Sequence, residues 1–385
     1  MIKNNEISTV FILHRFLPES FGGAEKSSLR LACDLKKKNV NTIILAPKLK
    51  KKTPSENFEN NILVKRFKVK HEPNLGGKKI FSFIFWSLKL IYWLFKNSKK
   101  YDIVHIIHGR LHAIPAIFAA KVLNKPIILK LGRGGSKYFD LNVVRKKKIF
   151  GFFYYRYIKK NVTAWIANSK IIVDDLKKHN IRDENIYKIY NGIDIKKIRV
   201  NKFRSNKNFI VVGRLDEEKC CDQIINVFSK IPENFNVKLH FLGDGSQEEY
   251  LKKLSKKLKQ SHRIFFKGPI TDVDKEIIKA DYYISASSSE GMSNSLLESM
   301  SLGVPGLVSN VSGIDEIVIN NKNGFIFEMG DEKSLYKQII NSINFSEADY
   351  INLSRSASEH IIKNFSIDQI SAKYTDLYSS LLRRN

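Results

Sequence analysis

Apolar and polar positions follow two alternating periods along the chain. Short apolar runs, typical of buried strands, are followed by stretches with apolar residues three and four positions apart, which are typical of helices. This alternation predicts an α/β fold in which parallel strands form a sheet with helices on both faces. In the first half the predicted strands are 7–13, 41–46, 61–69, 101–109, 125–131 and 162–168, and the clearest amphipathic helix is 24–37.

The second half of the chain repeats this alternation. Asn191-Gly192 is a turn-forming pair between the two halves. A chain of 385 residues is too long for one ordinary core, so we expect two domains. The strands predicted here are 209–213, 237–242, 282–286, 304–309 and 323–327, and the tail 366–382 is predicted to be an amphipathic helix.

Composition adds a strong positive charge, with a formal net value of +28. One interpretation is attraction to an anionic partner: a phospholipid surface, a phosphate-linked acceptor or a nucleic acid. The other is a composition rich in Lys, Asn and Ile throughout, and both interpretations remain open. In either case the charge draws the protein toward anionic membrane surfaces.

Cysteine usage indicates a reducing compartment. The three cysteines, two of them adjacent at Cys220 and Cys221, do not form a disulfide framework. The apolar run 7–13 has no small-residue cleavage site after it, so we interpret it as the first strand and not as a signal peptide. We therefore expect a cytoplasmic protein.

Two segments favour a membrane over nucleic acid as the anionic partner. Residues 80–95 are apolar and aromatic with flanking lysines, but these 16 residues fall short of the roughly 20 needed to span a bilayer. Residues 145–160 interleave basic and aromatic side chains. Both segments suit the headgroup layer of a membrane; alternatively, both are helices of the first domain that pack on its sheet. We favour membrane contact for 145–160 and leave 80–95 open.

The stretch 280–305 carries the strongest chemical pattern. A short apolar strand leads through a loop of small polar residues to Ser293-Asn294-Ser295, whose side chains can accept hydrogen bonds from the N–H groups of a first helical turn. Strand, polar loop and helix N-terminus together favour an anion such as phosphate. Two carboxylates flank this point, Glu290 and Glu298. They suit a ligand that also carries hydroxyls, with Glu298 on a ribose and Glu290 on a sugar beyond a diphosphate; the alternative is two solvated surface acids.

The segment Glu290-Gly-Met-Ser-Asn-Ser-Leu-Leu-Glu298, preceded by ADYYISASS and followed by SMSLGVP, resembles the E-x7-E signature of a known family. This is the family of retaining, nucleotide-sugar-dependent GT-B glycosyltransferases (glycosyltransferase family 4, glycosyl transferases group 1), and the resemblance covers essentially the whole chain. It implies two doubly wound, Rossmann-like domains facing across a cleft. The acceptor-binding domain would be 1–195, with a C-terminal helix 367–385 packed back on it, and the nucleotide-sugar-binding domain 196–366.

A second cluster stands at the start of the predicted second domain. The strand 209–213 ends in Gly213-Arg214 and Lys219 follows at a helix start, which places two cations at the carboxyl edge of a parallel sheet, where such sheets bind ligands. In the family these cations hold the diphosphate, so the resemblance assigns that role to Arg214, by bidentate contact, and to Lys219, as a point charge. Cys220 stands where the family usually has Gly. Either the helix starts differently, or Cys220 adopts the same backbone conformation.

The chain departs from the family near Gly132. Many members have a histidine at about this position, beside the reacting sugar, and a catalytic role cannot be carried over to glycine. One alternative is that Arg133 supplies positive charge there. The other is that His105 or His108 approaches from the neighbouring strand.

We expect neither a metal nor a cofactor. The spacing of His105, His108 and His112 suits neither one strand face nor a helical i, i+4 pair. Asp272 and Asp274 form a D-x-D sequence, but they precede a helix and are predicted to cap it.

The predicted function is retaining transfer of a sugar from a nucleotide sugar, UDP-sugar favoured over GDP-sugar, to a hydroxyl of a glycan acceptor in surface polysaccharide or lipopolysaccharide synthesis. Predicted partners are the nucleotide sugar, a glycan or lipid-diphosphate-linked acceptor and an anionic membrane surface on the inner face of the cytoplasmic membrane, without nucleic acid. The alternatives are a nucleotide-sugar epimerase or a phosphorylase of the same architecture, or a non-enzymatic basic protein that binds membranes or nucleic acid.

The resemblance also implies a set of site residues. Glu290, Arg214 and Lys219 are the predicted catalytic residues. The predicted donor-binding residues are Gly22, Gly23, Gly213, Arg214, Lys219, Gly243, Asp244, Gly291, Met292, Ser293, Asn294, Ser295 and Glu298.

Overall fold

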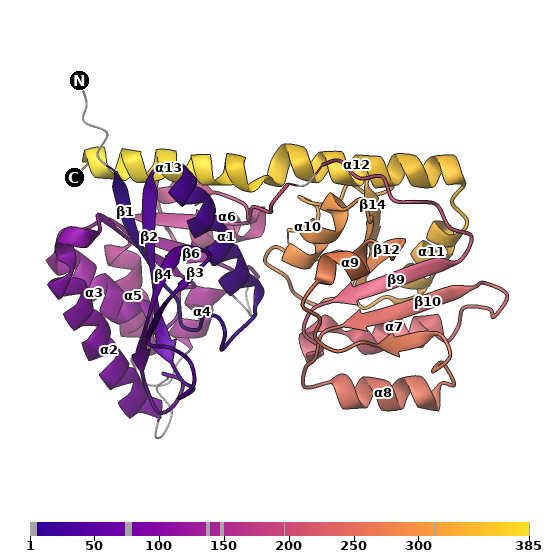
Figure 1. Ribbon diagram of the computed structural model, residues 1–385, viewed down its shortest axis with the longest axis horizontal. Helices are drawn as coiled ribbons and strands as arrows, with labels where there is room; N and C mark the ends of the chain where they lie inside the picture. Colours follow the sequence, from indigo (N-terminus) through magenta and orange to yellow (C-terminus); the bar gives the residue numbers. More distant parts are fainter. Residues whose placement is uncertain are drawn as a thin grey trace. The chain divides into compact units, whose positions relative to one another are not determined.

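The computed structural model describes residues 6–73, 79–135, 139–146, 150–195, 197–311 and 313–384. The chain divides into two compact units, residues 1–194 with 367–385 and residues 195–366. The boundaries expected from the sequence were 1–195 with 367–385, and 196–366. Each unit contains a largely parallel sheet with helices on both faces (Figure 1).

The sheet of the first unit has eight strands in the order β3-β4-β2-β1-β5-β6-β7-β8. All neighbouring pairs are parallel except β3–β4, which is an antiparallel hairpin at one edge. The sequence pattern did not predict β3, since its four residues lack an apolar run. The strands are β1 (Ile7–Ile12), β2 (Val40–Lys48), β3 (Glu56–Glu59), β4 (Ile62–Lys68), β5 (Ile103–Ile107), β6 (Ile127–Leu131), β7 (Ala164–Ala167) and β8 (Ile186–Lys188).

Helices cover both faces of this sheet and build two separate cores. One core contains side chains of α2, α3, α4, α5 and α6, and the other contains side chains of α1 and α13. The C-terminal helix α13 packs against α1 and belongs to the first unit. The helices are α1 (Gly23–Lys37), α2 (Lys79–Lys96), α3 (Ala113–Val122), α4 (Asp140–Arg145), α5 (Gly151–Asn161), α6 (Lys170–Lys178) and α13 (Ile367–Arg384), with short 3-10 helices η1 (Ser98–Lys100) and η2 (Asp183–Asn185).

The second unit has a six-stranded, fully parallel sheet in the order β11-β10-β9-β12-β13-β14. Helices α7, α8 and α11 share one core cluster with the strands, and α12 packs on α10. The strands are β9 (Lys207–Val212), β10 (Val237–Leu242), β11 (Ile264–Phe266), β12 (Tyr282–Ser285), β13 (Gly306–Ser309) and β14 (Gly324–Phe327). The helices are η3 (Glu217–Lys219), α7 (Cys221–Phe228), α8 (Glu248–Lys257), α9 (Val273–Ile277), α10 (Asn294–Ser301), α11 (Glu332–Ile343) and α12 (Glu347–Phe365).

The strand order of each sheet reverses at one point. In the first unit the chain builds β1, β2 and β4 in one direction and then β5, β6 and β7 in the other, so the reversal lies between β1 and β5. In the second unit β10 and β11 lie on one side of β9 and β12, β13 and β14 on the other, so the reversal lies between β9 and β12. Right-handed crossovers then put the connecting helices on opposite faces and leave a crevice at the carboxyl edge, where open α/β sheets bind ligands.

Helix α2 carries apolar side chains on both its buried and its exposed face, interrupted in the middle by Ser87 and the exposed Lys89. One stripe, at intervals of four residues, is buried against the sheet and α3, which confirms the packed-helix alternative for that side. A second stripe is apolar as well, and its four members are each more than half exposed. The buried stripe is Ser82, Trp86, Leu90 and Leu94, and the exposed stripe is Phe81, Phe85, Leu88 and Tyr92.

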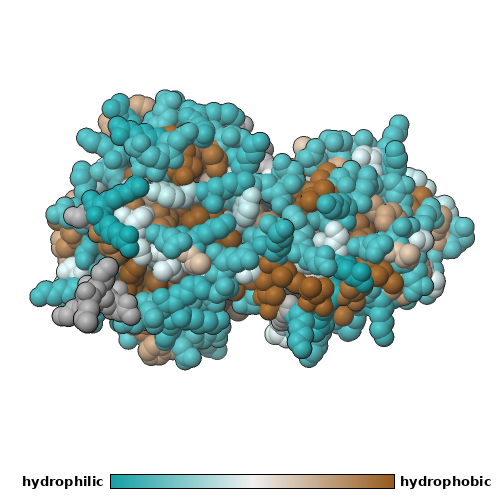
Figure 2. Space-filling model, turned by 90° about the horizontal axis from the view of Figure 1, so that it is seen from above, coloured by the Kyte–Doolittle hydropathy of each residue, from teal (hydrophilic) through white to brown (hydrophobic). Residues whose placement is uncertain are grey.

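The basic segment 145–160 forms the end of α4 and most of α5, and its residues 147–149 lie outside the described part of the chain. Helix α5 packs on α3 and α4 through buried residues such as Ile158, while Phe152 and Phe153 are exposed. Hydrophilic residues predominate on the face shown in Figure 2, with apolar residues in separate patches. Among the described residues, no helix combines the length and the apolarity needed to cross a bilayer.

Candidate active site

The stretch 280–305 folds as strand, loop and helix, as predicted. Strand β12 ends at Ser285, and α10 starts at Asn294 after an N-cap at Ser293, whose Oγ accepts a hydrogen bond from the N–H of Leu296 at 3.4 Å. Leu296 and its apolar neighbours on α10 are buried. Because the loop leaves the carboxyl end of β12, the first turn of α10 lies at the carboxyl edge of the sheet, next to the reversal point.

An ion pair connects the loops that follow β9 and β12. Nζ of Lys219 contacts Oε1 of Glu290, and the same oxygen accepts a hydrogen bond from Ser287 Oγ at 2.9 Å. The Lys219 side chain is 24% exposed and the Glu290 side chain 14%. Burial alone would lower the pKa of Lys219, but the Glu290 carboxylate beside it prevails and the pKa is raised. A permanent positive charge therefore stands at the reversal point of the second sheet.

Backbone contacts hold the same two loops together. The N–H and the hydroxyl of Ser288 both donate to the carbonyl oxygen of Glu218, at 2.9 Å and 3.2 Å. Cys220 has φ 46° and ψ 42°, the left-handed conformation usual for glycine, and α7 begins at the next residue. This conformation favours the second of the two alternatives for Cys220, and it costs a non-glycine residue roughly 1–2 kcal/mol.

Arg214 is more exposed than its predicted role suggests. Its side chain is 60% exposed and its guanidinium contacts Asp216 and, at 3.4 Å, Glu218. Asp216 also accepts hydrogen bonds from the N–H and hydroxyl of Ser246, both at 3.2 Å. Arg214 therefore belongs to a surface acid–base cluster beside Lys219, and a diphosphate would have to compete with two carboxylates for it.

Gly213 and Gly243 meet where β9 and β10 end. Both have positive φ, 145° and 130°, and a Cβ on Gly243 would overlap the carbonyl oxygen of Gly213. The overlap excludes a side chain at Gly243, and the positive φ disfavours one at Gly213. Asp244 is exposed, and its carbonyl oxygen accepts a hydrogen bond from the N–H of Leu215 at 2.8 Å.

The remaining predicted residues of the second unit gather around the start of α10. Gly291 and Met292 are buried, and Ser295 Oγ lies 3.0 Å from the hydroxyl of Tyr283. Asn294 and Glu298 are half-buried on α10, one turn apart. Sequence reasoning missed Ser287 and Ser288, because small polar loop residues carry no distinctive signal until their partners are known.

Gly22 and Gly23 lie in the first unit, at the N-terminus of α1. Gly22 is the N-cap residue, and a Cβ there would come 2.5 Å from Oε2 of Glu25. Glu25 is buried and accepts a hydrogen bond from Ser20 Oγ at 2.7 Å. The Glu25 carboxylate therefore lies beside the two glycines that were predicted to bind the donor.

The two histidine alternatives near Gly132 have different outcomes. His105 is fully buried, and its Nδ1 lies 2.9 Å from the hydroxyl of Tyr378 on α13. The expectation that His105 approaches the Gly132 loop is therefore wrong, because its ring faces the helix layer instead. His108 does lie against Gly132: a Cβ at position 132 would be 2.6 Å from Nδ1 of His108.

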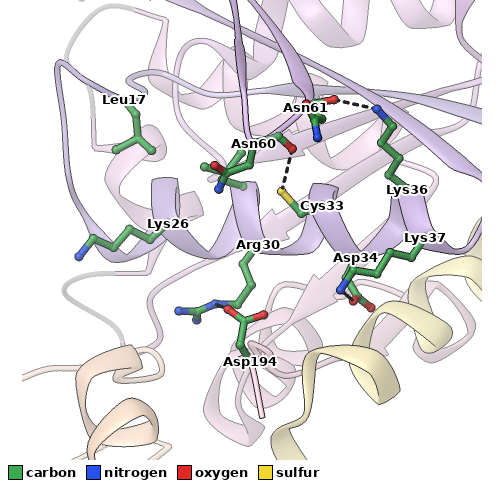
Figure 3. Close-up of a pocket in the computed structure, with 11 residues that line it drawn as sticks. Leu17, Lys26, Arg30, Cys33, Asp34, Lys36, Lys37, Asn60, Asn61 and Asp194 are labelled. Carbon is green, nitrogen blue, oxygen red and sulfur yellow. Dashed lines mark hydrogen bonds and ion pairs between the residues drawn. The ribbon is translucent and has the colours of Figure 1, made fainter. Parts of the chain in front are cut away.

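A separate cavity of about 600 Å³ lies along α1, lined among others by Lys26, Arg30, Lys36 and Asn61 (Figure 3). Lys36 donates to the carbonyl oxygen of Asn61 at 2.9 Å, and Arg30 pairs with Asp194 at 3.1 Å. These cations are thus engaged by the protein itself. None of the predicted site residues lines this cavity, so we place the candidate active site at the sheet edges.

The side chains at the edge of the second sheet can bind a ligand that carries both an anionic group and hydroxyls. Lys219 and the first-turn N–H groups of α10 suit phosphate oxygens, and Glu290 and Glu298 suit hydroxyl donors. In the described ranges no three His, Cys, Asp or Glu side chains are grouped as a metal site. As predicted, Asp272 caps α9 by accepting a hydrogen bond from the N–H of Lys275 at 3.4 Å.

Comparison with known families agrees with this geometry. The model described as glycosyl transferases group 1 matches residues 193–357, and the model described as glycosyltransferase family 4 matches residues 21–197. The two matches meet where the two units meet and together span most of the chain. The chain belongs to the GT-B glycosyltransferases. The predicted GT-B glycosyltransferase family and the fold class with two doubly wound domains are thereby confirmed, and retention of configuration stays a prediction.

Several curated relatives of this GT-B glycosyltransferase align over most of their length. An uncharacterized glycosyltransferase of Methanocaldococcus jannaschii is 28% identical over 89% of this chain and 91% of its own. The N-acetyl-alpha-D-glucosaminyl L-malate synthase of Bacillus anthracis is 24% identical over 81% of this chain and 84% of its own. The capsular polysaccharide biosynthesis glycosyltransferase CapM of Staphylococcus aureus is 24% identical over 69% and 74%.

Solved structures share the fold at lower identity. Anabaena HepE in complex with UDP and glucose superposes with a TM-score of 0.77 at 18% identity, covering 97% of this chain and 100% of that one. A mutant of S. aureus TarM in complex with fondaparinux, alpha-GlcNAc-glycerol and UDP gives a TM-score of 0.76 at 16% identity, covering 97% and 99%. At these identities the likeness concerns the fold of this GT-B glycosyltransferase.

Proposed function

We propose that this GT-B glycosyltransferase moves a sugar from a nucleotide sugar, UDP-sugar in preference to GDP-sugar, to a hydroxyl of a glycan acceptor with retention of anomeric configuration. The observation that carries the proposal is the Lys219–Glu290 pair beside the N-terminus of α10, at the reversal point of the second sheet. A fixed cation, first-turn N–H groups and carboxylates in one place match a diphosphate joined to a sugar.

The reaction would proceed by attack on the same face from which the leaving group departs. The bond from the anomeric carbon to the diphosphate oxygen breaks, the acceptor oxygen bonds to that carbon, and its proton passes to the leaving diphosphate. Lys219 and the N-terminus of α10 stabilise the charge that develops on the diphosphate. The Glu290 carboxylate already contacts Lys219 and Ser287. We therefore assign it to binding sugar hydroxyls and not to attack on the anomeric carbon. A covalent glycosyl-enzyme trapped on Glu290 would refute this mechanism.

The relatives support the choice of donor and pathway. Solved structures of HepE and TarM hold UDP, and CapM is named for capsular polysaccharide biosynthesis. We extend these properties to the present chain as a UDP-sugar donor and a role in surface polysaccharide or lipopolysaccharide synthesis, with a lipid-diphosphate-linked glycan as acceptor.

We also propose that the first unit rests on an anionic membrane from the cytoplasmic side. The exposed apolar stripe of α2 and the exposed Phe152 and Phe153 of α5 belong to helices that both pack on α3. An uncovered apolar stripe on a protein of net charge +28 matches an interface with anionic headgroups, where rings enter the headgroup layer and lysines meet phosphates.

The donor assignment is tested by thermal unfolding with UDP, GDP, ADP and their glucose conjugates in the presence of EDTA. A nucleotide at about 100 times its dissociation constant should stabilise the protein by roughly 2.7 kcal/mol. Glu298→Gln should weaken this effect, whereas Glu249→Gln, an exposed carboxylate on α8, should not. Proton NMR of the anomeric signal during donor turnover then reports retention or inversion. A protein that no nucleotide stabilises would overturn the proposal.

The membrane assignment is tested by flotation with vesicles of phosphatidylglycerol and phosphatidylcholine. Wild type should float with the anionic vesicles and not with pure phosphatidylcholine, and Phe85→Glu with Leu88→Glu should abolish flotation. Phe58→Glu is the control, because Phe58 is at least as exposed but lies on β3. Flotation unchanged in the α2 variant would refute the proposed surface, and self-association lost in that variant would identify the stripe as a contact between copies.

A further inference from the structure

The cavity along α1 is a groove whose lining residues all belong to the first unit (Figure 3). On α1 these residues run from Lys26 to Lys37 and follow one side of the helix over about 16 Å. Leu17 and the turn Asn60-Asn61 between β3 and β4 line the groove from beyond the helix. Its volume of about 600 Å³ falls within the range of roughly 300–1,000 Å³ that is usual for small-ligand sites. We call this feature the α1 groove.

The protein holds one wall of the α1 groove in place. Asn60 and Asn61 have φ of 47° and 64°, as the two central residues of a type I′ hairpin turn require. The carbonyl oxygens of this turn contact α1: Sγ of Cys33 lies 3.7 Å from that of Asn60, and Nζ of Lys36 donates to that of Asn61 at 2.9 Å (Figure 3). Both asparagines are exposed, so the wall offers amide donors and acceptors on a fixed backbone.

Charges of both signs line the α1 groove, with positive charge in excess. Asp34 is buried, and its carboxylate accepts hydrogen bonds from Ser371 Oγ of α13 at 2.6 Å and from Lys37 Nζ at 2.9 Å. Burial alone would raise the pKa of Asp34, but these two donors prevail and lower it, so the carboxylate is ionised. The lining cations are Lys26, Arg30, Lys36 and Lys37, and the lining carboxylates are Asp34 and Asp194.

This lining fits a ligand with separated carboxylates and many hydroxyls. Lysine and arginine bind carboxylates, and amide and carboxylate side chains bind hydroxyls. Lys36 can hold the hairpin turn and still contact a ligand, because an ammonium group has three N–H donors. Leu17 and Leu29 add apolar contact area for the carbon face of a sugar ring. An acidic polysaccharide has this combination of groups.

Two other anionic partners fit the α1 groove less well. A nucleic acid carries a phosphate on every nucleotide, and its closely spaced charges would meet the carboxylates of Asp34 and Asp194. A membrane surface is proposed for α2 and α5, whereas α1 belongs to the core on the other face of the sheet. The α1 groove therefore lies away from the proposed membrane contact.

We propose that the α1 groove binds a stretch of an acidic glycan chain, at a second carbohydrate site apart from the hydroxyl that reacts. The proposal rests on the proposed function, which supplies the glycan. Helix α1 begins at Gly23, after the carboxyl end of β1, and Lys36 lies about 20 Å further along the helix. A sugar bound beside Lys36 is thus remote from the sheet edge, and the groove holds one part of a longer chain while another part reacts.

The thiol of Cys33 reports occupancy of the α1 groove without any turnover. Cys33 and Cys220 are both half-buried and Cys221 is buried, so alkylation by iodoacetamide, followed by mass spectrometry of the peptides, compares two thiols in one protein. Burial raises the pKa of Cys33 and of Cys220, so the reaction is run at alkaline pH. Tetragalacturonate should slow alkylation of Cys33 and leave that of Cys220 unchanged. At about ten times its Kd the rate should fall about tenfold, because only the unliganded groove reacts.

Paired lysine variants test the electrostatic part of the proposal. Lys26→Gln with Lys36→Gln removes two cations of the groove, and glutamine keeps an N–H donor for the Asn61 carbonyl. The Kd for tetragalacturonate should rise at least about fivefold, and high salt should weaken binding by wild type. Lys253→Gln with Lys257→Gln, two exposed lysines of α8, removes the same charge elsewhere and should leave the Kd unchanged.

Three results would overturn the inference: no protection of Cys33 by tetragalacturonate, equal protection by neutral maltotetraose or by a thymidine tetranucleotide, and an unchanged Kd in the groove variant. UDP separates this inference from the proposed function, since it should protect Cys220, which follows Lys219, and not Cys33. If UDP does not bind while tetragalacturonate protects Cys33, the proposed function fails and the groove remains a glycan site. If UDP binds and Cys33 is never protected, the inference about the groove is wrong and the proposed function stands.

Discussion

The Lys219–Glu290 ion pair should be coupled strongly enough to measure in the absence of any ligand. Three variants test this: Lys219→Met, which keeps the length of the side chain and removes its charge, Glu290→Gln, which keeps the shape and removes the carboxylate, and the double variant. Each single change leaves one charge without its partner in a site that is about four-fifths buried. The double change removes both charges together.

The size of the effect follows from this burial. Removing one partner of a fully buried pair costs roughly 3–5 kcal/mol, and exposed pairs are worth about 0–1 kcal/mol. With side chains 24% and 14% exposed, we expect each single variant to lose about 1–3 kcal/mol of the free energy of unfolding. For a unit of about 170 residues this corresponds to roughly 2–10 °C in Tm. The double variant should lose clearly less than the sum.

The assay is urea unfolding of all four proteins, followed by fluorescence and combined as a double-mutant cycle. The matched control is the Lys230–Glu332 pair of the same unit, whose side chains are 59% and 31% exposed. Its cycle should give a coupling of about 0.5 kcal/mol or less. A Lys219–Glu290 coupling no larger than that of the control would refute the reasoning, because the two charges would then not hold each other in place.

Three further predictions concern stability. Gly303→Ala should destabilise the second unit by about 3 kcal/mol or more in urea unfolding, because φ is 77° and a Cβ would overlap the carbonyl oxygen of Arg199. The control Gly330→Ala, where φ is 80° and a Cβ would meet no other atom, should lower the free energy of unfolding by only about 1–2 kcal/mol. Burial lowers the pKa of His112 to about 3, so below pH 6.5 the unfolded state binds a proton that the folded state does not. The free energy of unfolding should therefore fall by up to about 1.4 kcal/mol per pH unit toward pH 3. In unfolding measured against pH, His112→Gln should flatten this slope. Burial lowers the pKa of Lys130 to about 8, so the free energy of unfolding should rise between pH 8 and 10.5. For the same reason Lys130→Met should raise it at pH 7 by about 1–3 kcal/mol. A less stable variant would refute the lowered pKa of Lys130.

Elements with a strong local signal could be predicted from the sequence. The run 282–286 followed by Ser293-Asn294-Ser295 contains both a strand period and helix-capping side chains, and the structure shows β12 and α10 there. Asp272 likewise caps α9 as its position suggested. The hairpin strand β3 was missed because its stability comes from pairing with β4, which a local pattern does not encode.

The candidate site was predictable in its residue types and not in its contacts. The resemblance marked Glu290 and Lys219 separately, but only the folded loops bring the two into an ion pair. The burial of His105 against α13 depends on a helix more than 250 residues away in sequence, which no pattern around His105 reveals. For the same reason Asp140, which follows β6 by several residues, was not recognised as a partner of His108.

The most direct test of the central claim, that the edge of the second sheet binds a nucleotide diphosphate, is calorimetric titration of UDP. Wild type, Lys219→Met, Glu298→Gln and the control Lys238→Met, an exposed lysine on β10, would be compared in the presence of EDTA. The account predicts binding by wild type and the control, and a Kd raised at least about tenfold in the other two, equal to about 1.4 kcal/mol. Equal affinity for UDP in all four proteins, or no binding by wild type, would contradict it.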